Sequence, residues 1–178
     1  MSSPITLETL RSDYAQANSI QTKTQLVAFH LKNYIITAAV EHLKAQRAQG
    51  KDVSELMKEV QNWFQDLEAL KTTLGQQVQN KDQARKQFSD FSLYLFKKAN
   101  DQFQSGNYSQ QLAEEFSTVI LLFEAYSIFD SPSQEIDSNS KDPFYSISIE
   151  IYAYIEKSSM EYFLQLSFSF YDITLIFP

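Results

Sequence analysis

The 178-residue sequence has no cysteine, three glycines, four prolines and two histidines. Without cysteine there is no disulfide framework and no thiolate metal site. His30 and His42 lie far apart, and no glutamate is spaced to complete a His-Glu-x-x-His or Glu-x-x-His unit with either. Three scattered glycines cannot build a phosphate-binding loop, and no Gly-x-Ser-x-Gly elbow is present. We therefore expect no enzyme, no metal and no cofactor.

Positive charge is also scarce, since 15 basic residues face 22 acidic ones and the net charge is −7. An acidic surface repels phosphate backbones, so nucleic acid is a poor partner. Such a surface suits basic peptides, or it only keeps the protein in solution. The N-terminus has no signal peptide, which makes a cytoplasmic protein the default expectation.

Hydrophobic residues make up 43% of the chain, enough for a packed core, and the lack of glycine and proline favours long helices. Apolar residues at three- and four-residue steps predict five helices, and we expect an all-α fold of two consecutive helical bundles over residues 5–130. Gly50 and Gly75 are the expected helix stops, and Asp52 with Glu55 has capping-box spacing. Ser109 is the expected cap of the fifth helix. The five helices are predicted from Leu7 to about Ala17, over 24–46, from about Asp52 to Leu74, over 81–104, and from Ser109 to about Phe129.

The end of the chain differs from the rest. A polar linker is expected over 130–143, and apolar and polar residues alternate over 145–151 as they do in a β-strand. From Phe144 onwards there are ten aromatic residues and a single basic one, Lys157. We expect this segment to pack on the bundle or to be a non-native or alternative C-terminus.

The third predicted helix contains two kinds of apolar residue. Its heptad-like core stripe consists of Leu56, Val60, Trp63, Leu67, Leu70 and Leu74. Met57 and Phe64 fall roughly 70–90° to one side of that stripe at about 100° per residue, and Glu68 follows one turn later. A partner helix could place leucines on this strip and an arginine against Glu68. Alternatively, Met57 and Phe64 only widen the contact with a neighbouring helix. The fifth helix raises the same question, with Phe116, Val119, Ile120, Leu122, Phe123 and Tyr126.

Three motifs in order resemble the Vta1 family, called LYST-interacting protein five in animals. The segment 26–34 is similar to the family's Leu-Val-Ala-Tyr-Tyr-Cys-Arg-Leu-Tyr run, with Gln25 in place of a proline and Leu31 in place of the cysteine. The segment 67–75 is similar to Leu-Glu-Ala-Leu-Lys-x-x-Leu-Gly. The segment 99–129 fits an Ala-Asp-x-x-x-x-x-Gly-x-Phe turn followed by a Phe-x-Thr-x-x-Leu-Leu helix. The resemblance covers about residues 1–130.

The resemblance implies an N-terminal pair of MIT-like three-helix modules, here over 1–76 and 77–158, followed by an atypical aromatic tail over 159–178. It implies binding of the C-terminal helices of ESCRT-III subunits and, through them, work with the Vps4 ATPase in multivesicular body sorting. The protein would be cytoplasmic and peripheral to the endosomal membrane. The family's contact on the third helix maps onto Phe64 and Leu67, so the predicted partner-binding residues are Met57, Phe64, Leu67 and Glu68.

Two departures from the family bear on the second module and on the ATPase. The family's closing Tyr-Ala-x-Trp-Lys-Ala helix is replaced by Pro143–Ser148, without the tryptophan or the lysine. We expect the family's ATPase-stimulating C-terminal domain to be missing, and therefore expect an adaptor that binds ESCRT-III without stimulating Vps4. The alternative function is a generic helical scaffold or oligomerisation bundle.

Overall fold

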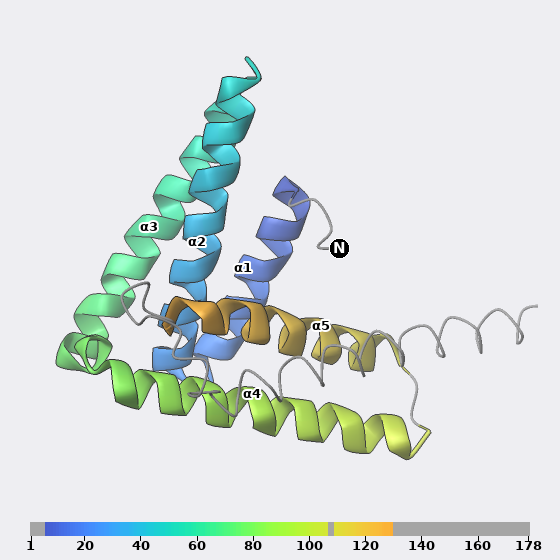
Figure 1. The fold of residues 1–178 in the computed structure, drawn as a ribbon. Helices are drawn as coiled ribbons and strands as arrows, with labels where there is room; N and C mark the ends of the chain where they lie inside the picture. The colour runs from blue at the N-terminus through green and yellow to red at the C-terminus, as the bar shows by residue number, and fades with distance from the viewer. Residues whose placement is uncertain (1–5, 107–108, 130–178) are drawn as a thin grey trace, which may run out of the picture. The chain divides into compact units, whose positions relative to one another are not determined.

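Every secondary-structure element that the structure describes is a helix. The structure is a computed structural model that describes residues 6–106 and 109–129. The prediction of an all-α fold is confirmed for these residues, which contain no strand. The linker 130–143 and the alternating segment 145–151 lie outside the described residues. In chain order the elements are α1 (Leu7–Gln21), α2 (Gln25–Ala48), α3 (Ser54–Leu74), the 3₁₀ helix η1 (Gly75–Gln79), α4 (Lys81–Gln104), α5 (Gln110–Ala125) and the 3₁₀ helix η2 (Tyr126–Phe129) (Figure 1).

The helix ends are set by local side-chain chemistry. Ser109 caps α5 as predicted, because its Oγ accepts a hydrogen bond from the backbone N–H of Leu112 at 3.2 Å. The predicted capping box of Asp52 and Glu55 is wrong. Asp52 accepts hydrogen bonds from the backbone N–H (2.9 Å) and the hydroxyl (2.7 Å) of Ser54, so it forms a turn just before α3. Glu55 forms an ion pair with Arg11 of α1 instead.

The chain divides into two compact units, and α4 and α5 each contribute to both. In the described part of the chain, the first unit consists of residues 6–93 and 121–129, and the second of residues 94–106 and 109–120. The expected module boundaries after residues 76 and 158 stay a prediction.

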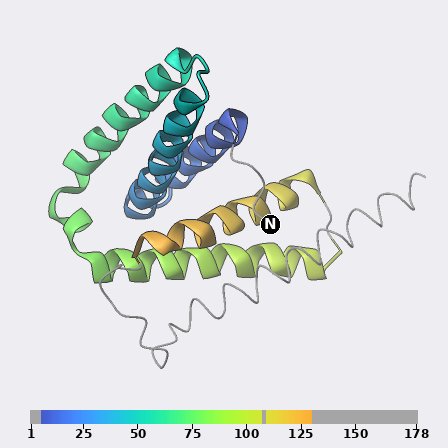
Figure 2. The ribbon, with the colours of Figure 1, turned by 45° about the horizontal axis from the view of Figure 1, so that its top comes forward.

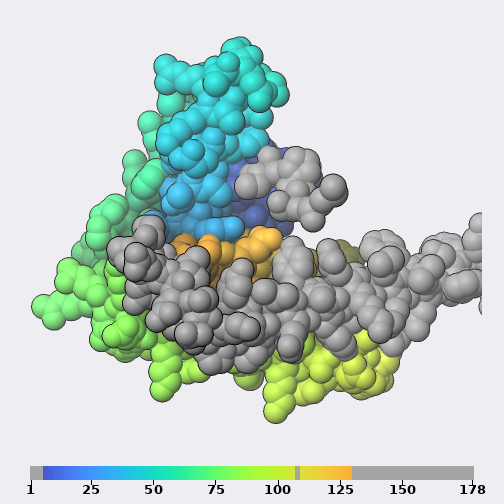
Figure 3. Space-filling view, in the orientation of Figure 1, coloured from blue at the N-terminus to red at the C-terminus, as the bar shows by residue number. Residues whose placement is uncertain are grey.

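In the first unit, α1, α2 and α3 lie side by side as an up-and-down bundle (Figures 1 and 2). At the end of the bundle where α3 leads into α4, an apolar cluster joins Leu26, Leu70, Leu74 and Ala84, with Phe29, Val78 and Phe129 packed against it. Phe129, the last described residue, therefore packs against residues of α2, α3 and α4 in this cluster. At the opposite end, residues 47–52 between α2 and α3 are exposed, and Figure 3 shows this end of the bundle on the surface.

In the second unit, the later part of α4 packs against the first part of α5. Lys98 Nζ lies 2.6 Å from Glu115 Oε1, and the amide of Gln102 donates to Glu115 Oε2 at 2.9 Å. Phe103 and Phe116 meet edge to face, with ring centroids 6.2 Å apart. Two polar contacts to Glu115 and the neighbouring aromatic contact to Phe116 together fix the register of the two helices.

Candidate partner-binding surface

The core stripe of α3 is buried almost as predicted. Leu56, Val60, Leu67, Leu70 and Leu74 are each at most 7% exposed. Trp63 is half-buried and stacks on Tyr14 of α1 with ring centroids 4.5 Å apart. The residues on the other faces of α3 are not part of the apolar core.

Met57 and Phe64 lie outside that core. Their exposed fractions are 47% and 44%, respectively, although both side chains are large and apolar. They are seven residues apart, about two helical turns, so they share one face of α3. The only other large hydrophobic residue classed as exposed in the described part of the chain is Tyr94, on α4.

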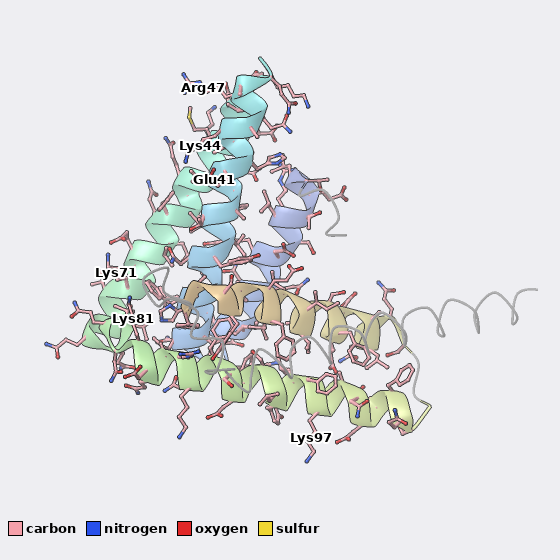
Figure 4. The ribbon with its side chains drawn as sticks, viewed as in Figure 1. Glu41, Lys44, Arg47, Lys71, Lys81 and Lys97 are labelled. Carbon is pink, nitrogen blue, oxygen red and sulfur yellow. The ribbon has the colours of Figure 1, made fainter. Side chains whose placement is uncertain are left out.

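Glu68 continues this face by one turn. Its side chain is 64% exposed, and its carboxylate lies 3.2 Å from the ammonium group of Lys71, which Figure 4 shows on the surface of α3. An exposed ion pair of this kind contributes only about 0–1 kcal/mol, so a partner's cation can replace Lys71 at little cost. We call Met57, Phe64 and Glu68 the α3 strip.

Leu67 does not belong to the α3 strip. It was predicted as a binding residue, but it is 5% exposed and lies on the core stripe. At about 100° per residue it is turned some 60° away from Phe64 towards the bundle, which accounts for its burial. A partner could reach it only after α3 moved.

The sequence analysis did not predict the buried charged residue Lys32. The side chain of Lys32 on α2 is fully buried, and its Nζ lies 2.5 Å from Asp66 Oδ2 on α3 and 2.5 Å from Gln21 Oε1 on α1. The hydroxyl of Tyr14 donates to the same Asp66 oxygen at 2.6 Å. The sequence does indicate this buried charge, because Lys32 lies in the largely apolar segment 26–36 and shares a helix face with Ala28, Ile35 and Ala39.

The pKa of the Asp66 carboxyl reflects this network. Burial alone would raise its pKa, but the hydrogen bonds from Lys32 and Tyr14 outweigh burial and lower it. For Tyr14, burial and the bond to Asp66 both raise the pKa of the hydroxyl. Asp66 is therefore a carboxylate, and the three helices are joined through an ion pair.

The apolar residues of α5 and two titratable groups, His30 and Asp13, lie outside the α3 strip and the Lys32 network. Phe116, Val119, Leu122 and Phe123 on α5 and Tyr126 in η2 are buried, and Ile120 is half-buried, so most of these apolar residues serve packing. Burial lowers the pKa of His30 to about 4, and burial with the nearby charge of Glu124 raises the pKa of Asp13 to about 6. In residues 6–106 and 109–129, no three His, Cys, Asp or Glu side chains come together as metal ligands.

None of the helices in the described part of the chain combines the length and apolar character needed to cross a bilayer. A helical bundle with an exposed apolar strip edged by a carboxylate is the class of molecule that these observations define. The chain belongs to the Vta1-like family, whose family model matches residues 10–165. This match extends past residue 130, where the motif resemblance ends. No curated protein matches the chain. The family is one of cofactors of the Vps4 ATPase in the ESCRT pathway.

Proposed function

We propose that the chain is an adaptor that binds the C-terminal helices of ESCRT-III subunits through the α3 strip. It would act with the Vps4 ATPase in multivesicular body sorting, in the cytoplasm and at the endosomal surface through its partners. The observation that carries the proposal is Phe64, which is 44% exposed on a helix whose core stripe is buried. Large apolar side chains left outside a core mark contact sites when they share one face.

The charge of the α3 strip supports the same proposal. An amphipathic helix placed on Met57 and Phe64 would bring its next turn to Glu68, whose carboxylate is 64% exposed. An arginine at that turn could form a two-bonded pair with the carboxylate and replace Lys71. The net charge of −7 favours a basic partner in the same way.

The substitution Phe64→Asp tests the proposal. Binding of an ESCRT-III tail peptide at micromolar affinity corresponds to about −8 kcal/mol, and the loss of one apolar anchor costs about 2 kcal/mol or more. We expect affinity to fall about 30-fold in a calorimetric titration. The fold should be retained, because Phe64 is not part of the core.

The matched control is Asn62→Asp, which adds the same charge to α3 at an exposed position outside the α3 strip. Its affinity should equal that of the wild type. Equal affinity of the Phe64→Asp chain, or no binding by the wild type, would count against the adaptor and in favour of a generic helical scaffold.

A further inference from the structure

The fully buried ammonium group of Lys32 connects all three helices of the first bundle. Its Nζ contacts Gln21 of α1 and Asp66 of α3, and it lies 5.2 Å from the ring centre of Tyr14. Tyr14 in turn donates to Asp66. Each of these contacts depends on direction, unlike the apolar contacts around them.

Such a pair is a poor source of stability. Removing a charge from water costs about as much as the ion pair returns, and apolar side chains of similar volume often replace buried pairs without loss. Lys32 is a long chain of methylenes that methionine could replace in the same volume. The network therefore calls for an explanation other than stability.

Apart from the stack of Trp63 on Tyr14, the core stripe leaves the rotation of α3 weakly defined. Four of its members are leucines, at 56, 67, 70 and 74, and leucine-rich cores specify one arrangement poorly. Rotating α3 about its axis would exchange some of these contacts for others of the same kind. Burying Phe64 in this way would even gain apolar contact.

Asp66 resists that rotation because of its position. Asp66 and Phe64 are two residues apart, so at about 100° per residue they lie on opposite flanks of the core stripe. Turning Phe64 inward would carry Asp66 outward and break its bonds to Lys32 and Tyr14. Glu59, on the same flank as Asp66, is paired with Arg11 and opposes the same movement.

We propose that Lys32 is a positioning residue, which holds α3 at the rotation that turns Met57 and Phe64 to the solvent. The network selects one of several packings of similar stability. The α3 strip exists as a surface because this packing is selected. The inference rests on the proposed function only for its binding measurement, since the rotation itself can be measured without a partner.

The absence of cysteine allows a direct measurement of the rotation. A single thiol is introduced either at Met57 (47% exposed) or at Val60, which is one turn away on the core stripe and 4% exposed. Both are labelled with a soluble maleimide under native conditions. In the wild-type background, Met57→Cys should react far faster than Val60→Cys.

We expect the ratio of the two labelling rates to fall at least about tenfold in Lys32→Met, because α3 then samples several rotations. Urea unfolding of Lys32→Met should give the same or a higher midpoint, since Asp66 keeps its bond to Tyr14 and its side chain is 45% exposed. If Lys32 only stabilised the fold, Lys32→Met would lower the urea midpoint. If Lys32 positions α3, the variant changes the labelling ratio without lowering the midpoint. An unchanged ratio overturns the proposal.

The double variant Lys32→Met/Asp66→Leu covers the case in which the single variant does not fold. It replaces both members of the ion pair by apolar side chains, and the same drop in the ratio is expected. Binding of the ESCRT-III tail peptide should weaken in parallel. If the wild type binds the peptide while the ratio is unchanged, the positioning role is refuted and the adaptor stands. If the ratio falls but the wild type binds no peptide, the positioning role is supported and the adaptor is refuted.

Discussion

At the scale of single residues, His30 makes the stability of the fold depend on pH. Its ring lies between Phe29 and Phe129, with centroids 5.1 Å from each. In the described part of the chain its buried Nε2 has no hydrogen-bond partner. Burial disfavours the imidazolium, and this lowers the pKa of His30 from 6.5 to about 4. The folded state therefore holds the ring neutral where the unfolded state protonates it.

The consequence is a loss of stability in acid. Between pH 6.5 and about 4 the unfolded chain binds more protons at His30 than the folded chain, so the free energy of unfolding falls as the pH falls. The effect is about 3 kcal/mol for a fully shielded ring and about 2 kcal/mol for a half-buried one. We predict that the free energy of unfolding of His30→Leu, relative to that of the wild type, rises by this amount when the pH falls from 7 to 4. Urea unfolding at both pH values measures the change.

Protonation of Asp13 has the opposite effect on stability, but it does not affect the comparison of the wild type with His30→Leu. Its pKa is raised from 3.8 to about 6, so protonation between those values favours the folded state. The wild type and His30→Leu share Asp13, and its contribution cancels in their difference. His42→Leu controls for the loss of a histidine elsewhere on α2. A difference between wild type and His30→Leu that does not vary with pH would contradict the prediction.

At the scale of the elements, Gly75 decides where α3 ends. Its φ of 57° and ψ of −124° belong to a region that residues with a side chain avoid. A Cβ placed there would meet no atom within 4 Å, so the cost of a substitution is conformational and not steric. This geometry lets the chain turn from α3 into η1 and α4.

We predict that Gly75→Ala lowers the free energy of unfolding by about 2 kcal/mol, since alanine is strained in this conformation. Urea unfolding monitored by circular dichroism measures the change. Gln77→Ala, at an exposed position in the same turn, should change stability by less than about 0.5 kcal/mol. Equal midpoints for the two variants would show that the turn tolerates a side chain.

At the scale of the whole molecule, the end of the described chain completes the core of the first unit. The ring of Phe129 lies 5.5 Å from that of Phe88 and 5.7 Å from that of Tyr126, and it packs on the cluster of Leu26, Leu70 and Leu74. Tyr126 also accepts a hydrogen bond from Arg85 at 2.8 Å. The first bundle is therefore not independent of Phe129.

We predict that Phe129→Ala destabilises the chain by about 2 kcal/mol, less than for a fully buried phenylalanine because Phe129 is half-buried. The loss of stability should appear as faster hydrogen exchange of the backbone amides of α1–α3. Ser127→Ala, at an exposed position in η2, is the control. Unchanged exchange in α1–α3 would mean that the first bundle holds its core alone.

The sequence by itself determined the helices and most of the α3 strip. Apolar spacing and three glycines placed five helices with ends within a few residues of those observed, because helix period and helix stops are local properties. The same period predicted that Met57 and Phe64 lie off the core stripe. It also placed Leu67 on the core stripe, where Leu67 is buried; Leu67 was predicted as a binding residue from the family resemblance and not from the period.

Only the tertiary structure decided the contacts between distant residues. Lys32 and Asp66 are 34 positions apart, and Phe88 and Phe129 are 41 apart. No period connects such residues, because their distance depends on how whole helices pack. The sequence therefore determined which faces are apolar. Packing decided which of these faces are buried, which charge is paired inside the bundle, and which strip is left for a partner.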